Sequence, residues 1–257
     1  MTSGIARRRA ALGSLSLCLT VAAAGGCTTF VEVPVETPLQ SKIDVGSFRR
    51  ILIAGFATEP GPQEVDIVPE TVRLLQNQLR SNTQLRVIEA DRPPLTDALE
   101  RATSEMGEPA LLGGPEREQY LLEAERILGD AEFWRKIGEE YQSPLIVTGL
   151  IGFQEQNRSG FQAQERVVRD ASGRPQLVRG NRYLERKGYA LSADFHFVDG
   201  RTGELIHKEK FTEEVLYGVD QRISPLSSYF ELMDRLLPNF LGVISPQKIR
   251  GTRILLK

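Results

Sequence analysis

A short apolar run at residues 51–56 sets the strongest limit on how this chain can fold. An uninterrupted run of this kind is typical of a strand buried on both faces. Residues 65–81 then place their apolar side chains on one stripe of an amphipathic helix, and residues 85–89 follow as a second strand. A β-α-β unit normally joins parallel strands. The sequence therefore predicts a sheet covered by helices.

The middle of the chain alternates irregular and regular segments. Residues 91–115 carry several prolines and glycines around a possible helix at 96–105, so we expect an irregular insertion or loop there. Residues 116–128 have a helical composition, and Asp130 is expected to cap the helix that follows. Residues 145–153 form the third predicted strand.

Alternating apolar and polar residues indicate a hairpin over residues 161–189. Its two strands flank a turn-rich segment at 170–175, and the hairpin is expected to project from the domain. Six arginines make it a candidate contact for another protein: Arg166, Arg169, Arg174, Arg179, Arg182 and Arg186. An anionic glycan would also suit these cations, and a simple solvated hairpin explains them equally well.

The C-terminal part is predicted to be mostly antiparallel. A strand at 189–198 and a strand at 205–217 are joined by a turn at 199–204. A final helix begins at Ser224 and Pro225, and Pro238 is expected to kink or split it. The predicted fold class is thus α/β of the α+β type. Residues 48–257 form one domain whose mixed sheet starts β-α-β, with helices packed on it, an extended hairpin and a C-terminal helix.

The N-terminus carries an export signal that ends at a cysteine. Arg7, Arg8 and Arg9 precede a largely apolar segment at 10–24, which is shorter than the roughly 20 residues that a spanning helix needs. Two other interpretations of this segment are an ordinary secretory signal, cut near Ala24, and an uncleaved membrane anchor. Beyond the cysteine, two prolines within residues 27–47 indicate an extended tether.

The small residues before Cys27 resemble the lipobox of bacterial lipoproteins. This resemblance implies cleavage between Gly26 and Cys27 and acylation of Cys27, so that membrane lipid is the first partner. The usual leucine three residues before the cysteine is replaced by Ala24. Because Thr28 rather than aspartate follows Cys27, the resemblance implies the periplasmic side of the outer membrane in a Gram-negative host.

Composition restricts the classes of partner and of chemistry. Cys18 lies inside the signal, so the mature chain is expected to have no disulfide. Removal of three arginines with the signal leaves 29 basic and 34 acidic residues, a net charge of −5, which argues against nucleic acid as a partner.

No catalytic or phosphate-binding motif is present in the sequence, and no cofactor is expected. The two histidines, His196 and His207, lie on different predicted strands, and one simple pairing makes them opposite each other. A weak metal site therefore stays open, although a structural zinc site lacks a cysteine ligand. Asp194 is interpreted as a hydrogen-bonded structural acid. The chain is thus expected not to be an enzyme.

The order of these elements resembles the CsgG/LpoB/TolB-N-terminal type of envelope lipoprotein domain. The matching segments are 51–56, 85–89, 144–149, 197–199 and 202–204. The resemblance implies a periplasmic domain that binds an envelope protein or assembles as a homo-oligomer, without catalysis. We therefore expect a lipid-anchored binding or assembly protein in envelope biogenesis or secretion. The alternative is a subunit of a curli-type outer-membrane export pore, which the charged hairpin disfavours because each Arg or Lys in lipid costs about 2–4 kcal/mol.

The lipid anchor can be tested at one residue. Cys27→Ala is expected to abolish incorporation of labelled palmitate, because the thiol that carries the first acyl chain is lost. Continued labelling of the variant would contradict the lipoprotein assignment.

Overall fold

The computed structural model describes residues 30–59, 65–104, 114–218, 221 and 224–256. The chain divides into two compact units, and residues 39–247 make up the larger one. In the smaller unit, β1 (Phe30–Leu39) pairs with β8 (Gln247–Leu256) as a two-stranded sheet, in which Arg250 donates to Glu36 over 3.0 Å. Residues 30–39 form a paired strand. Strand β8 was not anticipated, and residues 248–257 belong to this smaller unit and not to the predicted single domain 48–257.

The larger unit contains a six-stranded mixed sheet. Its order is β4-β2-β5-β6-β7, and β3 pairs with β5 beside that path. The strands are β2 (Arg50–Ile53), β3 (Ala57–Thr58), β4 (Arg86–Ile88), β5 (Leu145–Arg169), β6 (Pro175–Asp199) and β7 (Leu205–Gly218). Strand β2 runs parallel to β4 and β5, while β5, β6 and β7 are antiparallel. The predicted mixed α+β class with a parallel β-α-β start is confirmed.

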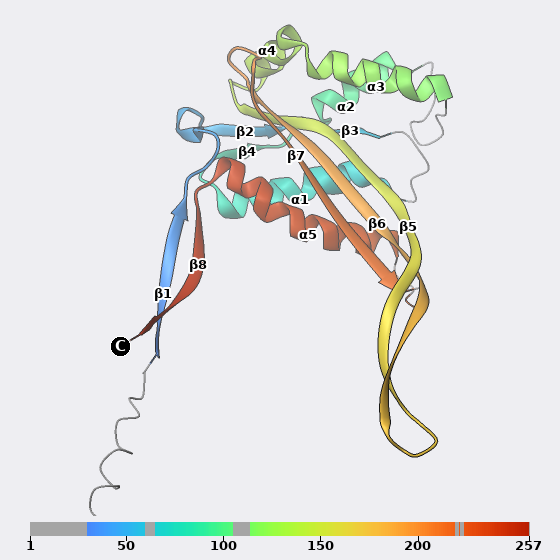
Figure 1. The fold of residues 1–257 in the computed structure, drawn as a ribbon. Coiled ribbons are helices and arrows are strands. Elements are labelled where there is room, and N and C mark those ends of the chain that lie inside the picture. The colour runs from blue at the N-terminus through green and yellow to red at the C-terminus, as the bar shows by residue number, and fades with distance from the viewer. Residues whose placement is uncertain (1–29, 60–64, 105–113, 219–220, 222–223, 257) are drawn as a thin grey trace, which may run out of the picture. The chain divides into compact units, whose positions relative to one another are not determined.

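Helices cover both faces of this sheet (Figure 1). On one face lie α1 (Ile67–Asn82) and α5 (Pro225–Ile244). On the other lie α2 (Pro94–Ala102), α3 (Gly114–Leu128) and α4 (Ala131–Glu140). Strand β2 contributes side chains to both faces. Ile51 and Ile53 pack on the side of α1 and α5, Leu52 packs on the side of α2, α3 and α4, and all three are buried. The first part of the short apolar run is therefore the strand buried on both faces that its sequence predicts, and this strand ends at Ile53.

Side-chain caps fix the helix starts. The carboxylate of Asp130 accepts from the backbone N–H of Phe133 at the start of α4, and Ser224 accepts from Ser227 at the start of α5, as predicted. Helix α2 lies two to three residues earlier than the predicted 96–105. It occupies part of the expected insertion at 91–115, and residues 105–113 of that segment lie outside the described residues.

Helix α5 runs through Pro238 without the predicted break. A proline removes one backbone N–H and frees the carbonyl four residues earlier, here that of Asp234. Both residues are exposed, so water can satisfy that carbonyl, while Leu236, Leu237 and Phe240 hold the opposite side of the helix in the core. Burial of the apolar face outweighs the lost hydrogen bond. None of the helices in the described ranges has the length and apolar character needed to cross a bilayer.

Residues 39–47 belong to the larger unit, although the sequence suggested that the tether reaches residue 47. Ile43 is buried, and its backbone N–H donates to the carbonyl of Val243 over 3.0 Å. Asp44 caps a single 3₁₀ turn, Val45–Ser47, by accepting from the N–H of Gly46. This segment therefore packs with the domain that it precedes.

A buried glycine fixes the contact between α4 and the turn after β6. A methyl group on Gly138 would overlap the carbonyl oxygen of Gly200. Exposed Gly→Ala changes in helices usually stabilise by about 1 kcal/mol, but overpacking costs about 1–3 kcal/mol. We therefore expect Gly138→Ala to lower the free energy of unfolding, measured by chemical denaturation.

Gly160→Ala is the matched control, because nothing lies within 4 Å of the position that its new methyl group would take. The control is expected to stay within about 0.5 kcal/mol of the parent. A stabilised Gly138→Ala variant would show that α4 and this turn are not in close contact.

Candidate functional site

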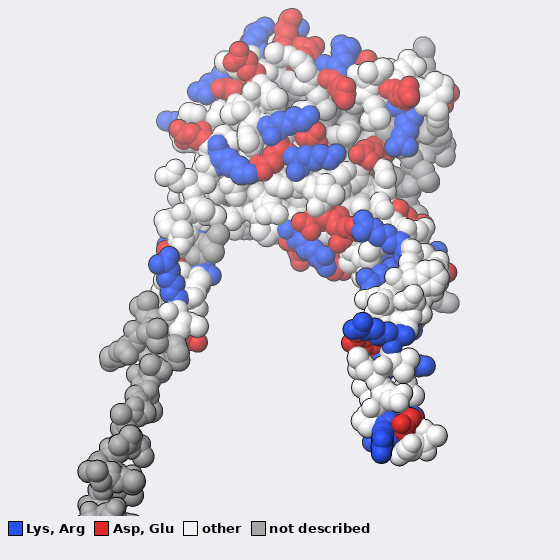
Figure 2. All heavy atoms as spheres, in the orientation of Figure 1, with Lys and Arg blue, Asp and Glu red and all other residues white. Residues whose placement is uncertain are grey.

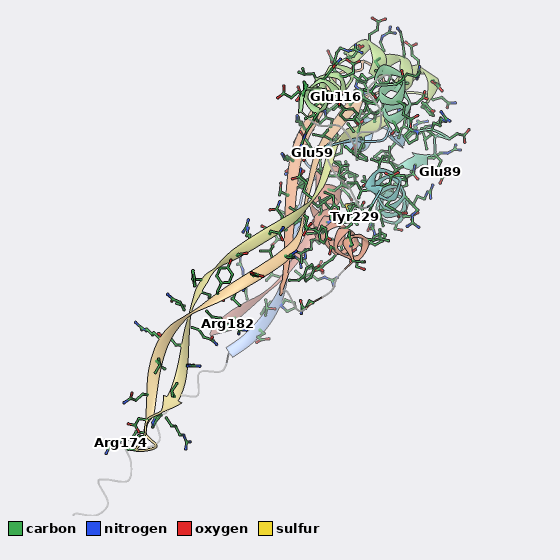
Figure 3. All side chains as sticks on the ribbon, turned by 90° about the vertical axis from the view of Figure 1, so that its right-hand side faces the viewer. Glu59, Glu89, Glu116, Arg174, Arg182 and Tyr229 are labelled. Atoms are coloured by element: carbon green, nitrogen blue, oxygen red, sulfur yellow. The ribbon has the colours of Figure 1, made fainter. Side chains whose placement is uncertain are left out.

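Strands β5 and β6 continue out of the sheet as a two-stranded arm. They pair without interruption from Leu145 opposite Asp199 to Arg169 opposite Pro175, whereas the third strand, β7, ends its pairing at Arg186. Residues 158–186 beyond that point are here called the arm. At about 3.4 Å per residue it reaches roughly 35 Å. Figure 3 shows Arg174 at its tip and Arg182 part-way along it.

The hairpin was predicted, but its strands are longer than expected. The sequence indicated a strand at 145–153 separate from a hairpin at 161–189, and the structure joins them into 25-residue strands. The linking segment, 154–160, is polar on both faces, so no apolar alternation marks it as a strand. Its backbone is nevertheless held by the ladder to β6.

The turn at the tip is organised by Asp170. Its carboxylate oxygen Oδ1 accepts from the backbone N–H groups of Ser172 and Arg174, both over 2.9 Å. Gly173 has a φ of +78°, a conformation that favours glycine. These contacts explain why the turn-rich segment 170–175 closes the hairpin where the sequence placed it.

One face of the arm carries only basic charges. Residues with even numbers share a face because directly paired positions add to an even number and side chains alternate along each strand. This arginine face comprises Arg158, Arg166, Arg182 and Arg186. Within the two strands of the arm, which the structure describes throughout, no acidic residue has an even number, and Asp170 belongs to the tip turn. Figure 2 shows basic side chains recurring along the arm, with a few acidic side chains beside them.

The arginine face contains an unfavourable pair at its base. Arg158 lies directly opposite Arg186, and like charges at opposed positions destabilise a sheet. Glu214 on β7 compensates in part, because its carboxylate is 2.9 Å from the Arg158 guanidinium. Arg166 and Arg182 lie farther out, beyond the end of β7. The outer half of this face therefore keeps a net positive charge that an acidic partner could neutralise.

The opposite face of the arm is apolar and balanced in charge. Phe161 and Tyr183 are paired across the strands with ring centroids 5.2 Å apart, and they are 74% and 51% exposed. Val167 and Leu177 form a second exposed pair nearer the tip. The guanidinium of Arg179 is 2.6 Å from the carboxylate of Glu165 on the same face. We call this side of the arm the aromatic face. Large apolar side chains in a row are rarely exposed on soluble proteins except at contact surfaces.

The structure separates the six arginines that the sequence singled out. Arg166, Arg182 and Arg186 lie together on the arginine face, while Arg169 and Arg179 lie on the aromatic face, and Arg174 belongs to the tip turn. Arg158 was missed. Arg158 would have been identified if residues 145–169 had been recognised as one strand, because its even number places it on the same face as Arg166.

The two histidines are not brought together. A register shift between Phe197 and Val198 sets His196 opposite Lys208 and His207 opposite Phe197, so the pairing of the two histidines that the sequence left open does not occur. They consequently face opposite sides of the sheet. His207 lies 3.1 Å from Glu209, and His196 lies near Asp194. No group of three or more possible metal ligands occurs among the described residues. Gly26 and Cys27 lie outside those residues.

Comparison with known proteins gives no family. No protein-family model matches the chain, and no curated protein matches it. A solved structure of the lipoprotein GNA1162 from Neisseria meningitidis overlaps 74% of this chain and 98% of its own, with 12% identity and a TM-score of 0.32. A neuraminyllactose-binding hemagglutinin homolog from Helicobacter pylori overlaps 82% and 87%, with 11% identity and a TM-score of 0.30. Overlaps this weak support no conclusion about fold or function.

The arm is expected to be dispensable for folding. If Asn-Gly replaces residues 160–184, a two-residue turn joins Ser159 to Glu185, which are already paired. The removed aromatic and ionic pairs lie within the arm, so the free energy of unfolding should change by less than about 1 kcal/mol.

Phe153→Ala provides the contrast on the same strand. Phe153 is buried in the core and stacks on Tyr189, so its truncation should cost about 3–5 kcal/mol in the same denaturation experiment. A comparable loss from the shortened arm would mean that the arm helps to hold the domain together.

Proposed function

We propose that this chain is a lipid-anchored, non-catalytic protein of the bacterial envelope that binds another envelope protein through its arm. The lipobox-like segment ending at Cys27 supports the anchor, and the residue that follows supports the periplasmic side of the outer membrane. The resemblance of the sequence to the CsgG/LpoB/TolB-N-terminal type of domain supports a role in the envelope.

The observation that carries the proposal is the division of the arm into an arginine face and an aromatic face. Tryptophan, tyrosine and arginine are the side chains enriched at the energetic centres of protein interfaces. Arg166 and Arg182 present guanidinium groups free to form paired hydrogen bonds with carboxylates, while Phe161 and Tyr183 present apolar area. A protein that offers acidic and apolar groups together fits both faces.

The arm is also placed for recognition rather than chemistry. Its base is continuous with the buried core through Phe153 and Leu191, so the ladder holds the strands where they leave the domain. A rigid scaffold that presents exposed side chains at a distance favours contact with a large partner.

A homo-oligomer is the alternative that one observation favours. Phe161, Val167 and Leu177 are exposed along one face, and such a row could pack against another copy, as in a subunit of a curli-type export pore. The arginine face opposes contact with lipid, because burying several unpaired guanidinium groups is costly. We therefore assign the aromatic face to the same partner protein as the arginine face.

Crosslinking in the intact envelope tests the proposal. Gln164 lies on the arginine face between Arg166 and Arg182, and a photoreactive residue there is expected to capture a second protein species. Arg166→Gln with Arg182→Gln should reduce the adduct at least about tenfold, the effect of 1.4 kcal/mol.

Arg49→Gln with Arg86→Gln is the matched control, because it removes two exposed positive charges from the larger unit outside the arm. Equal loss in both double variants would reject the arginine face as the contact. Absence of any heterologous adduct would reject the proposed function, and an adduct between two copies of this chain would favour the oligomeric alternative.

A further inference from the structure

The arm leaves one backbone edge of β6 unpaired. Strand β7 accompanies β6 only as far as Arg186, which lies opposite Gly218 (Figure 1). From there to the tip, residues 175–185 pair with β5 on one side, and no other described strand pairs with them on the other. The edge has neither a bulge nor a proline after Pro175, two devices by which proteins prevent strand addition. It can therefore accept a further strand.

Hydrogen bonds at the two ends of the ladder between β5 and β6 show which residues face this edge. Asp170 donates its N–H to the carbonyl of Arg174 over 2.9 Å, and Gly200 donates to the carbonyl of Pro144 over 3.0 Å. Both pairs continue the register of the ladder, so even-numbered residues are the ones bonded between the two strands. The odd-numbered residues of β6 within 177–185 therefore direct their N–H and C=O groups to the outer edge.

A strand at this edge explains how one partner contacts both faces of the arm. The arginine face and the aromatic face lie on opposite sides of a two-stranded ribbon, so a surface that packs on one side does not reach the other. An added strand sends alternate side chains to the two sides. The position opposite Arg182 lies on the arginine face, and the positions opposite Tyr183 and Leu177 lie on the aromatic face. Opposite charges and apolar pairs at such positions stabilise a sheet.

Charge complementarity selects the occupant of the edge. Arg182 on β6 and Arg166 on β5 make the arginine face positive beyond the end of β7. A second copy paired antiparallel through the same edge would be related by a two-fold axis perpendicular to the sheet, so the arginines of both copies would lie on one side. Like charges across a sheet are destabilising. A strand with acidic residues on this side and apolar residues on the other is complementary to both faces.

We propose that the outer edge of β6 at residues 177–185 binds an extended segment of the partner protein as a third, antiparallel strand in which acidic and apolar residues alternate. The segment continues the path of β7, which itself runs antiparallel to β6 and ends its pairing at Arg186. Its acidic side chains meet Arg182 and its apolar side chains meet Tyr183. This inference rests on the proposed function, because the partner is the same protein. It adds the backbone contacts and the sequence pattern of the bound segment.

Synthetic peptides test the sequence pattern. The probe is a fluorescein-labelled octapeptide with blocked ends in which glutamate and valine alternate. It is titrated with the full-length chain in a non-ionic detergent, and fluorescence anisotropy reports binding. Its Kd should be at least about tenfold lower than that of a block peptide, in which all the glutamates precede all the valines. The block peptide has the same composition and charge, but as a strand it presents both residue types on both faces.

Methylation of the peptide backbone tests the strand pairing itself. In the proposed strand the valines lie opposite odd-numbered residues of β6, so their N–H groups point to β6 and those of the glutamates point away. N-methylation of the valines should therefore weaken binding at least about tenfold, whereas N-methylation of the glutamates should keep the Kd within about threefold of the probe. Equal affinities of the two methylated peptides, or weaker binding of the glutamate-methylated one, would overturn the proposal.

Two proline variants identify the edge that is used. Asn181 and Ala163 lie directly opposite each other, and as odd-numbered residues they direct their N–H groups to the outer edges of β6 and β5, respectively. Asn181→Pro removes a donor at the proposed edge and should weaken binding of the probe at least about tenfold. Ala163→Pro is the matched control and should keep the Kd within about threefold. Circular dichroism checks that both variants are folded, and the reverse order of their effects would contradict the proposal.

Failure of the strand addition is distinguishable from failure of the proposed function. A parent chain that does not bind the probe, or that binds the probe and the block peptide equally, would overturn the third strand. The crosslink from Gln164 and its dependence on Arg166 and Arg182 would persist in that case, because they require only side-chain contact with the partner.

Discussion

The uninterrupted ladder between β5 and β6 is the constraint on which the rest of the molecule depends. Its inner part is the middle of the sheet, where Val147, Ile151, Phe195 and Phe197 are buried under α1 and α5. Its outer part is the exposed arm. Because side chains alternate strictly along a strand, the burial of the inner residues decides which outer residues share a face. The core thereby sets the composition of the arginine face.

Electrostatic organisation changes along the same ladder. In the domain, charged groups are paired locally, as between Asp194 and Lys208 or between Arg201 and Asp199. At the base of the arm, Glu214 still reaches Arg158 from the third strand. Beyond it, the arginine face has no acidic counterpart, and its charge is available to a partner. The positive charges of the arginine face are thus compensated within the protein only as far out as the third strand, β7, reaches.

Much of the fold follows from local sequence signals. The buried run at 51–56, the amphipathic stripe of α1 and the caps at Asp130 and Ser224 were predictable because each depends on nearby residues. The turn at 170–175 was predictable for the same reason.

Features that depend on distant pairing were not predictable. The polar segment 154–160 is a strand only because β6 lies beside it, and β8 has β1 as its partner. The register shift at Phe197 moved His207 away from His196, and no local signal marks such a shift. In the candidate site, the arginines were found from the sequence, but their division between two faces required the register.

An arm made by extending two paired strands can vary in length only in fixed steps if its recognition surface is to survive. Deleting one residue from each strand removes one pair and turns every position farther out to the opposite side. Arg166 and Arg182 would then exchange places with the aromatic residues. Deleting two residues from each strand restores the original sides and shortens the arm by about 7 Å. The distance over which this protein reaches a partner is therefore adjustable in increments of two residue pairs, independently of the chemistry that it presents.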